Sequence, residues 1–217
     1  MAVSFFVKKG SGFPTGDDFS EGIGDWTGYA SDSDATMDWY QNNSLRLSIN
    51  LGSAGEQDGI QSVWKYALLG DFDMEVGYQR LTQGPIGPQN CNDGFLISPV
   101  NDGSFNNNAI SVLNVASLSL MRSIYVLDGV VQQIVDNSTK PVATLNNLRL
   151  RITKVGSIFT TYHDPSTGSW EVVSQFNAPD FENVVIYPVF NESRSSSTYV
   201  STKFYNFKVN SGIVELP

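Results

Sequence analysis

Three carboxylates alternate along one short stretch of the chain, at Asp71, Asp73 and Glu75. Alternate residues of a β-strand point to the same face, so an extended backbone would place the three acids side by side. Two carboxyl groups on one face are the minimum for glycoside hydrolysis. A solvated antiparallel strand also carries charge on its outward residues without any catalysis. We therefore treat the three acids as weak catalytic candidates, and a glycoside hydrolase as the alternative to a protein that is not an enzyme.

The single histidine and the single cysteine limit other catalytic chemistry. A Ser-His-Asp arrangement would have to include His163, which precedes Asp164 and which we expect in a solvated turn. Cys91 lies between two asparagines and has no basic neighbour in the sequence to lower its pKa, which is typical of an unreactive thiol. The counts also exclude an internal disulfide and a zinc site built from several histidines.

Oxygen-bearing side chains gather at Asp32, Asp34 and Asp38. Carboxylate oxygens are ligands that calcium prefers, so these residues form a weak candidate metal site. They do not complete an EF-hand loop, and such side chains in turns more often bind the nearby backbone. Calcium is therefore the one cofactor that we consider, and the alternative is that none is bound.

Aromatic side chains could stack on sugar rings, whose C–H faces suit a flat π surface. The tryptophan and tyrosine candidates are Trp26, Trp39, Trp64, Trp170, Tyr40, Tyr66, Tyr78 and Tyr125. Most of them must lie in the core of a protein of this size. Trp64 and Tyr66 would share one strand face, and we predict that they form an exposed stacking pair. The polar residues predicted to bind carbohydrate beside them are Asn92, Asp93, Asn101 and Asp102.

Alternating apolar and polar residues predict antiparallel strands with one buried and one wet face. The alternation is clearest at residues 44–51, 71–78 and 148–155. Further strands are expected at 59–66, 93–98, 109–115, 118–127, 130–135, 157–163, 169–175, 183–190 and 198–209. Helical periodicity is almost absent. We therefore predict an all-β protein, an antiparallel two-sheet β-sandwich or jelly roll.

The chain has 217 residues and a formal net charge of −9, which disfavours nucleic acid as a partner. No apolar run is long enough to insert into a membrane. Residues 1–16 read as an arm that could dock on a scaffold or capsid protein, and residues 17–217 as one domain. In this arm the apolar residues precede the lysines, the reverse of a classical signal peptide, so we expect cytoplasmic synthesis, with association with a virion as one later location.

Several segments resemble concanavalin A-like lectin/glucanase domains, which include laminin G-like domains. Asp17-Asp18-Phe19 followed by Trp26 is similar to their first strand, in which the tryptophan packs under the sandwich. The segment 70–76 is similar to a central strand, 148–172 to a strand pair that ends in a Gly-Ser-Trp turn, and 203–209 to the closing strand. The resemblance covers roughly residues 17–210 and implies a concanavalin A-like jelly roll of about twelve to fourteen strands that binds or cuts polysaccharide, with calcium in some relatives.

The glycanase branch of that fold has a Glu-x-Asp-x-Glu motif, and the stretch from Asp71 to Glu75 is the nearest match, with Asp in place of the first Glu. The first hypothesis for function is a non-catalytic carbohydrate-binding or adhesive module, displayed on a particle surface. The alternatives are a phage structural protein, such as a capsid decoration or tail appendage that binds no sugar, and a glycoside hydrolase.

Overall fold

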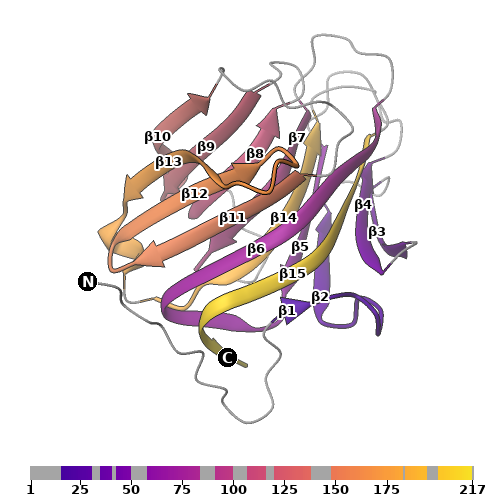
Figure 1. Ribbon diagram of the computed structural model, residues 1–217, viewed down its shortest axis with the longest axis horizontal. Helices are drawn as coiled ribbons and strands as arrows, with labels where there is room; N and C mark the ends of the chain where they lie inside the picture. The colour runs from indigo at the N-terminus through magenta and orange to yellow at the C-terminus, as the bar shows by residue number, and fades with distance from the viewer. Residues whose placement is uncertain are drawn as a thin grey trace.

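In a computed structural model of the protein, the chain forms two antiparallel sheets that pack face to face (Figure 1). The structure describes residues 16–30, 35–40, 43–49, 58–83, 91–99, 107–115, 120–137, 148–182, 184–194 and 200–216. Of the predicted arm 1–16, only Gly16 belongs to this part of the chain, so the docking role of the arm stays a prediction. Within these residues no helix is long and apolar enough to cross a membrane.

The eight-stranded sheet, called sheet A here, has the order β13-β12-β11-β6-β15-β4-β3, with β1 paired to β15. Its strands are β1 (Gly16–Asp17), β3 (Ala35–Tyr40), β4 (Ser44–Ile49), β6 (Ala67–Gln83), β11 (Leu148–Val155), β12 (Ile158–Asp164), β13 (Glu171–Asn177) and β15 (Val200–Glu215). In Figure 1, β11, β6 and β15 cross the front of the molecule side by side.

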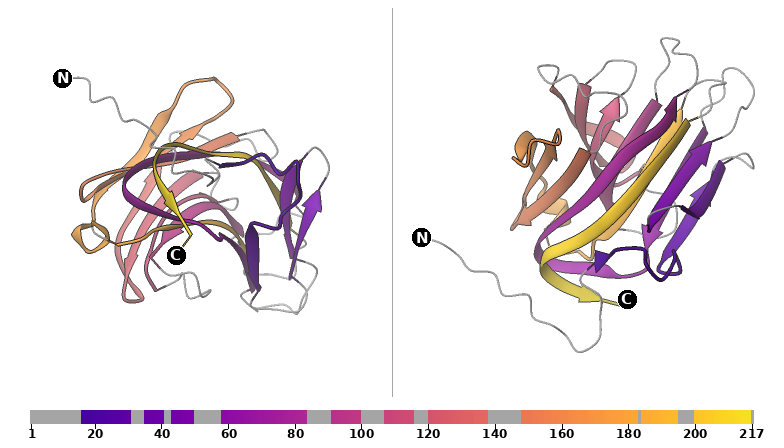
Figure 2. Two further views of the ribbon diagram at one scale, coloured as in Figure 1. Left: turned by 90° about the horizontal axis from the view of Figure 1, so that it is seen from below. Right: turned by 45° about the vertical axis from the view of Figure 1, so that its right-hand side comes forward.

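The seven-stranded sheet, called sheet B, has the order β10-β9-β8-β7-β14-β5-β2 and lies behind sheet A in Figure 1. Its strands are β2 (Trp26–Ala30), β5 (Asp58–Trp64), β7 (Cys91–Ser98), β8 (Ala109–Val115), β9 (Leu120–Leu127), β10 (Val130–Asn137) and β14 (Tyr187–Arg194). A single 3-10 turn, η2 (Pro179–Phe181), interrupts the strands that the structure describes. The predicted all-β sandwich is thus confirmed, and Figure 2 shows its layers from two further sides.

The core between the sheets is built from the residues that alternation placed inward. Leu148, Leu150 and Ile152 of β11 lie beside Tyr78, Val76 and Met74 of the neighbouring strand β6, and all six belong to one buried cluster. Each fully buried side chain of this size stabilises the fold by roughly 1.5–3 kcal/mol. The outward residues between them are thereby held in fixed positions on the opposite face of sheet A.

The predicted packing of Trp26 under the sandwich is confirmed, although the motif spans the end of β1 in sheet A and the start of β2 in sheet B. Trp26 is buried, and its indole N–H donates a hydrogen bond of 2.8 Å to Asp17. Phe19 is fully buried beside it, with ring centroids 5.9 Å apart. The Trp26 ring also stacks on Phe190 of β14 at 4.1 Å. These contacts anchor the start of the described chain between the two sheets.

The predicted exposed pair of Trp64 and Tyr66 is wrong. Trp64 is 0% exposed and packs edge-on against Phe207, with ring centroids 5.0 Å apart. Tyr66 is half-buried and packs against the same core. The outward neighbour Val63 is itself buried, in a second cluster with Leu96 and other residues on the outer side of sheet B. Because β5 is apolar on both faces at this end, its alternation does not identify a wet face.

The predicted solvated turn at His163 is also wrong. Strand β12 continues through Asp164, so His163 lies inside the strand and its side chain is fully buried. Its Nε2 lies 3.4 Å from a carboxylate oxygen of Glu171 on the neighbouring strand β13. The turn begins only after Asp164, which explains why the Asp-Pro sequence misplaced the histidine.

Candidate functional site on the outer face of sheet A

The three central strands of sheet A bring charged side chains into cross-strand rows on the outer face. Glu75 of β6 lies opposite Arg151 of β11, and Asp73 lies opposite Thr153. Arg149 lies opposite Gly77 on one side and opposite Asp164 of β12 on the other. The predicted common face of Asp71, Asp73 and Glu75 is consistent with this register, because Phe72 and Met74 between them are buried.

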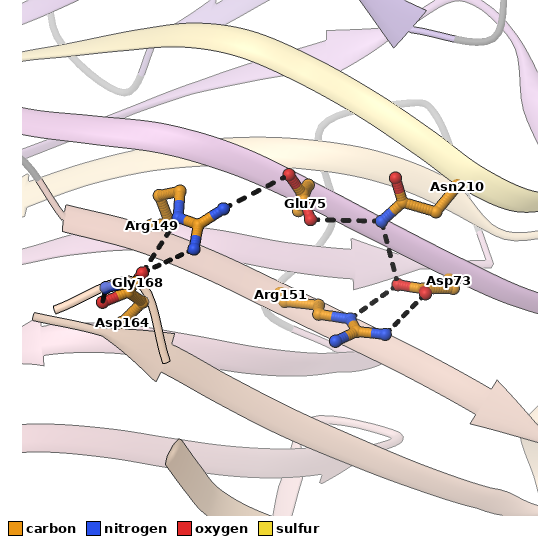
Figure 3. Close-up of polar contacts among 7 residues, drawn as sticks. All are labelled: Asp73, Glu75, Arg149, Arg151, Asp164, Gly168 and Asn210. Carbon is orange, nitrogen blue, oxygen red and sulfur yellow. Dashed lines mark hydrogen bonds and ion pairs between the residues drawn. The ribbon is translucent and has the colours of Figure 1, made fainter. Parts of the chain in front are cut away.

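Arg151 and Asp73 form a two-pronged ion pair (Figure 3). The Nε and Nη2 atoms of Arg151 donate hydrogen bonds of 2.8 and 2.6 Å to the two carboxylate oxygens. This geometry matches the planar fork of a guanidinium to the two oxygens of a carboxylate. The same hydrogen bonds raise the pKa of Arg151 above its ordinary value. Asp73 is therefore fixed in position by Arg151 and accepts hydrogen bonds through both of its oxygens.

Arg149 lies between two acids (Figure 3). Its Nε and Nη2 atoms donate to one oxygen of Asp164 at 3.0 and 2.6 Å, and Nη1 lies 3.8 Å from Glu75. The other oxygen of Asp164 accepts the backbone N–H groups of Thr167 at 2.8 Å and Gly168 at 3.1 Å. Burial raises the pKa of Asp164, but these hydrogen bonds outweigh it and hold that pKa below its ordinary value. The residue thus fixes both the arginine and the following turn.

Asn210 of β15 joins the two acids of β6. Its side-chain amide donates hydrogen bonds to Glu75 at 3.1 Å and to Asp73 at 3.4 Å (Figure 3). Three strands, β6, β11 and β15, therefore contribute to one connected array of hydrogen bonds. The array presents N–H donors and carboxylate acceptors side by side on a surface of regular backbone.

Aromatic rings flank this array at its β12 and β13 side. The Trp170 ring lies 4.6 Å from the guanidinium carbon of Arg149 and 5.5 Å from that of Arg151. Tyr162 of β12 meets Trp170 edge-on at 6.5 Å and lies 5.2 Å from Arg151. Both rings are only half-buried, so part of each remains at the surface. Stacking on the guanidinium groups fixes the orientation of both rings.

A third ring, Tyr205 of β15, lies across the other side of the array. A Cβ atom added to Gly77 would come 2.3 Å from Cε2 of Tyr205, so the ring lies against the bare backbone of β6 at this point. Burial raises the pKa of the Tyr205 phenol, and Arg149 lowers it by a smaller amount. The phenol is therefore neutral at physiological pH and can both donate and accept a hydrogen bond.

This arrangement combines half-exposed rings with fixed hydrogen-bond donors and acceptors. Sugars present apolar C–H faces to rings and hydroxyl groups to charged partners, so the array has the chemistry to bind a glycan. Hydrolysis would further require one carboxylic acid that keeps a proton to donate. Both oxygens of Asp73 accept hydrogen bonds from Arg151, so neither is free to reach a glycosidic oxygen. Asp71 is exposed and accepts the backbone N–H of Gly156 at 2.7 Å.

The other predicted sugar-binding residues lie away from this array, in sheet B or outside the described chain. Asp93 is 0% exposed and forms an ion pair with Arg80 between the sheets, so its prediction as a surface sugar contact is wrong. Asn92 is half-buried on the outer side of sheet B, where its carbonyl accepts a hydrogen bond from Asn191 at 3.3 Å. Asn101 and Asp102 lie outside the described residues.

The candidate metal site is described only at Asp38, because Asp32 and Asp34 lie outside the described residues. Both carboxylate oxygens of Asp38 accept hydrogen bonds from Arg46, one of them at 2.8 Å. A carboxylate already bound by a guanidinium does not fit the ligand role that calcium requires. In the described ranges no group of three or more histidine, cysteine, aspartate or glutamate side chains could hold a metal ion.

Sequence reasoning passed over the residues that complete the array. Trp170 is one of eight candidate aromatics, and the Gly-Ser-Trp turn that contains it indicated a structural role and not a sugar contact. The strand pair 148–155 and 157–163 did contain a usable signal, because a tight turn at Gly156 sets the register that places Tyr162 opposite Arg151. Tyr205 gave no such signal, since its position over Gly77 depends on strands far apart in the sequence.

The architecture is that of the concanavalin A-like jelly-roll β-sandwiches, as the resemblance predicts. Similar solved structures include the carbohydrate-binding module CBM66 from Bacillus subtilis, with a TM-score of 0.53 and 14% identity over 84% of this chain and 93% of that one. A lectin from Bauhinia forficata, solved with GalNAc, has a TM-score of 0.53 and 11% identity over 88% and 96% of the two chains.

A third structure comes from work on endo-acting O-glycanases that members of the human gut microbiota express to initiate mucin breakdown. It has a TM-score of 0.64 and 11% identity over 93% of this chain and 98% of that one. No family model matches the sequence, and no curated protein matches it. At these identities the likeness concerns the fold alone, so the function has to be argued from the residues.

Proposed function

We propose that the protein is a non-catalytic carbohydrate-binding module, and that its binding surface is the outer face of sheet A around Trp170. The observation that carries this proposal is the half-exposed Trp170 ring, which is stacked on Arg149 and Arg151 beside a connected array of donors and acceptors. A ring fixed in this way offers a sugar a flat apolar surface without loss of side-chain entropy on binding.

The named solved structures add support of a weaker kind. A carbohydrate-binding module and a lectin share the architecture, so this sandwich is compatible with sugar binding. A shared fold does not transfer a function, and the proposal rests on the array itself.

Hydrolysis is the second candidate, favoured by one observation. Glu75 lies half-buried on the same face, and its contact with Arg149 is long, at 3.8 Å, so it is less firmly held than Asp73. As a catalytic group it would lose its chemistry in the Glu75→Gln variant, which keeps the side-chain shape. A binding module would retain most of its affinity in this variant and release no products from any polysaccharide.

A glycan-array screen of the purified protein tests the proposal, with the bound glycans incubated afterwards and analysed for cleavage products. We expect binding without products, and a loss of several-fold to about tenfold in affinity for Trp170→Ala, since stacking contributes roughly 0.5–1.5 kcal/mol. The matched control is Trp39→Ala, because Trp39 is also exposed, at 55%, but lies on edge strand β3. Equal losses in both variants, or cleavage abolished by Glu75→Gln, would contradict the proposal.

A further inference from the structure

Two lysines on β15 differ from the other basic side chains that the structure describes. Most of those basic groups are ion-paired with a carboxylate, namely Arg46, Lys65, Arg80, Arg122, Arg149 and Arg151. Lys154 is buried and donates to the carbonyl oxygens of Gly70 and Glu182. Apart from Lys154, and among the basic side chains that the structure describes, which do not include that of Arg194, Lys203 and Lys208 are the two without an ion pair to a carboxylate.

Both lysines lie on the outer face of sheet A, on either side of Tyr205. Lys203 is half-buried, and its ammonium group lies 5.6 Å from the centre of the Tyr205 ring. Lys208 is exposed and lies opposite Glu75, which is already engaged by Asn210. The lysines therefore extend the polar array of the candidate site along β15 with two cations that form no ion pair with a carboxylate of the described side chains.

Because the protein is acidic overall, the two unpaired lysines indicate the charge of the ligand. The chain carries 22 acidic and 13 basic residues, so carboxylates to pair with are abundant. A lysine that remains unpaired on such a protein keeps its full charge for a ligand, whereas an ion-paired one must first give up its partner. That both unpaired lysines flank one aromatic ring of the site points to an anionic ligand.

The spacing of the lysines sets the size of that ligand. Lys203 lies opposite Gln79 and Lys208 lies opposite Glu75, four residues apart on β6. This separation corresponds to about 13 Å along the strand, which is longer than a single sugar ring. We propose that this face binds an acidic glycan with carboxylate or sulfate groups on more than one unit, and that Lys203 and Lys208 bind those groups. The inference rests on the proposed function.

Two matched pairs of polymers test it by affinity electrophoresis and titration calorimetry. Polygalacturonate is compared with its fully methyl-esterified form, and dextran sulfate with dextran, so that each pair differs only in its anionic groups. We expect wild type to bind at least one acidic member more tightly than its neutral counterpart. Preference for polygalacturonate would identify carboxylates, and preference for dextran sulfate would identify sulfates.

The variant Lys203→Gln/Lys208→Gln removes the two unpaired cations, and we expect its affinity for the acidic polymer to fall about tenfold. The control Lys65→Gln/Arg122→Gln changes the net charge equally but removes cations that are paired with Asp25 and Asp136. We expect it to bind like wild type. The salt dependence of the affinity does not by itself show that the two lysines bind the polymer. Salt screens both their attraction for it and its repulsion by the net negative charge of the protein.

Equal binding of charged and neutral polymers, or a double lysine variant that binds like wild type, would overturn the inference. If either result were found and Trp170→Ala still bound glycan more weakly than wild type, the proposed function would stand and the inference of an acidic ligand would not. If the protein bound only neutral glycans in the glycan-array screen, that result would overturn the inference but not the proposed function. Absence of binding to every glycan would overturn the proposed function and the inference together.

Discussion

Gly77 determines where one aromatic ring of the candidate site lies. Its missing Cβ leaves the space that the Tyr205 ring occupies, and an added methyl group would come 2.3 Å from that ring. We predict that Gly77→Ala displaces the ring from the sheet and weakens glycan binding several-fold. The unfolding free energy should change by less than about 1 kcal/mol, because alanine suits a strand better than glycine does. Titration calorimetry and urea unfolding measure the two effects.

Gly24→Ala is the matched control, since nothing lies within 4 Å of the Cβ that it adds. It should leave both affinity and stability close to those of wild type. A Gly77→Ala variant that binds glycan as well as this control would show that Tyr205 takes no part in the site.

Asp164 gives the site a pH dependence in stability. Its hydrogen bonds from Arg149 and from the turn hold its pKa below the ordinary value, so it stabilises the fold above about pH 4. That contribution is lost as the pH falls through the lowered pKa of the folded state. We predict that Asp164→Asn lowers the unfolding free energy by about 2 kcal/mol at pH 7, and by much less near pH 3. Urea unfolding at both pH values tests this, and a constant difference would contradict it.

For the strands, the alternation of apolar and polar residues predicted position and inward face correctly where one face is polar. It gave the wrong face where both faces are apolar. The strands predicted at 44–51, 71–78 and 148–155 correspond to β4, β6 and β11, with the described residues of each inward as expected, because one face of each is polar. Strand β5 has Val63 and Trp64 buried on opposite faces, so its sequence could not reveal which side met solvent. The position of the Tyr162 ring opposite Arg151 depends on the register of β11 and β12. In the sequence, the turn at Gly156 is the one local indication of that register.

Strand β10 forms the open edge of sheet B, and it exposes apolar side chains. Val131 and Ile134 are each 50% exposed, and an exposed apolar edge favours pairing with other chains. We predict that Val131→Lys/Ile134→Lys raises the concentration at which the protein stays monodisperse, and changes the unfolding free energy by less than about 0.5 kcal/mol. Light scattering during concentration measures the first effect. A strongly destabilised variant would mean that these side chains pack against something in the fold.

At the scale of the whole molecule, a buried ion pair ties the two sheets together. Arg80 of β6 and Asp93 of β7 are almost fully buried, and Thr202 of β15 donates a hydrogen bond of 3.2 Å to the same carboxylate. We predict that Arg80→Met lowers the unfolding free energy by about 3–5 kcal/mol, because it leaves a buried carboxylate without its partner. Chemical unfolding measures the loss.

The double variant Arg80→Met/Asp93→Leu removes both charges and should recover most of that stability. If it were as unstable as the single variant, the pair would be stabilising in itself and not merely costly to break. The sequence misassigned Asp93 to a sugar site because its partner lies on another strand, and an acid in an Asn-Asp-Gly stretch looks like a loop residue.

The fold was predictable from the sequence because alternation, turn residues and the first-strand motif agree over most of the chain. The site was only partly predictable, since it depends on which outward residues of β6, β11, β12 and β15 become neighbours. The acids of β6 were found, whereas their arginine partners and flanking rings follow from the sheet order β12-β11-β6-β15.

Binding of a glycan at Trp170 can be followed by NMR of the tryptophan indole N–H groups. The chain has four tryptophans, and Trp26, Trp39 and Trp64 lie in the core or on edge strand β3. During titration with a glycan chosen from the glycan-array screen, we predict that the Trp170 indole signal shifts until the site is saturated. The signals of the other three indoles should stay in place. Saturable binding that leaves the Trp170 signal unmoved, or that shifts the Trp39 signal instead, would show that the glycan does not bind at Trp170.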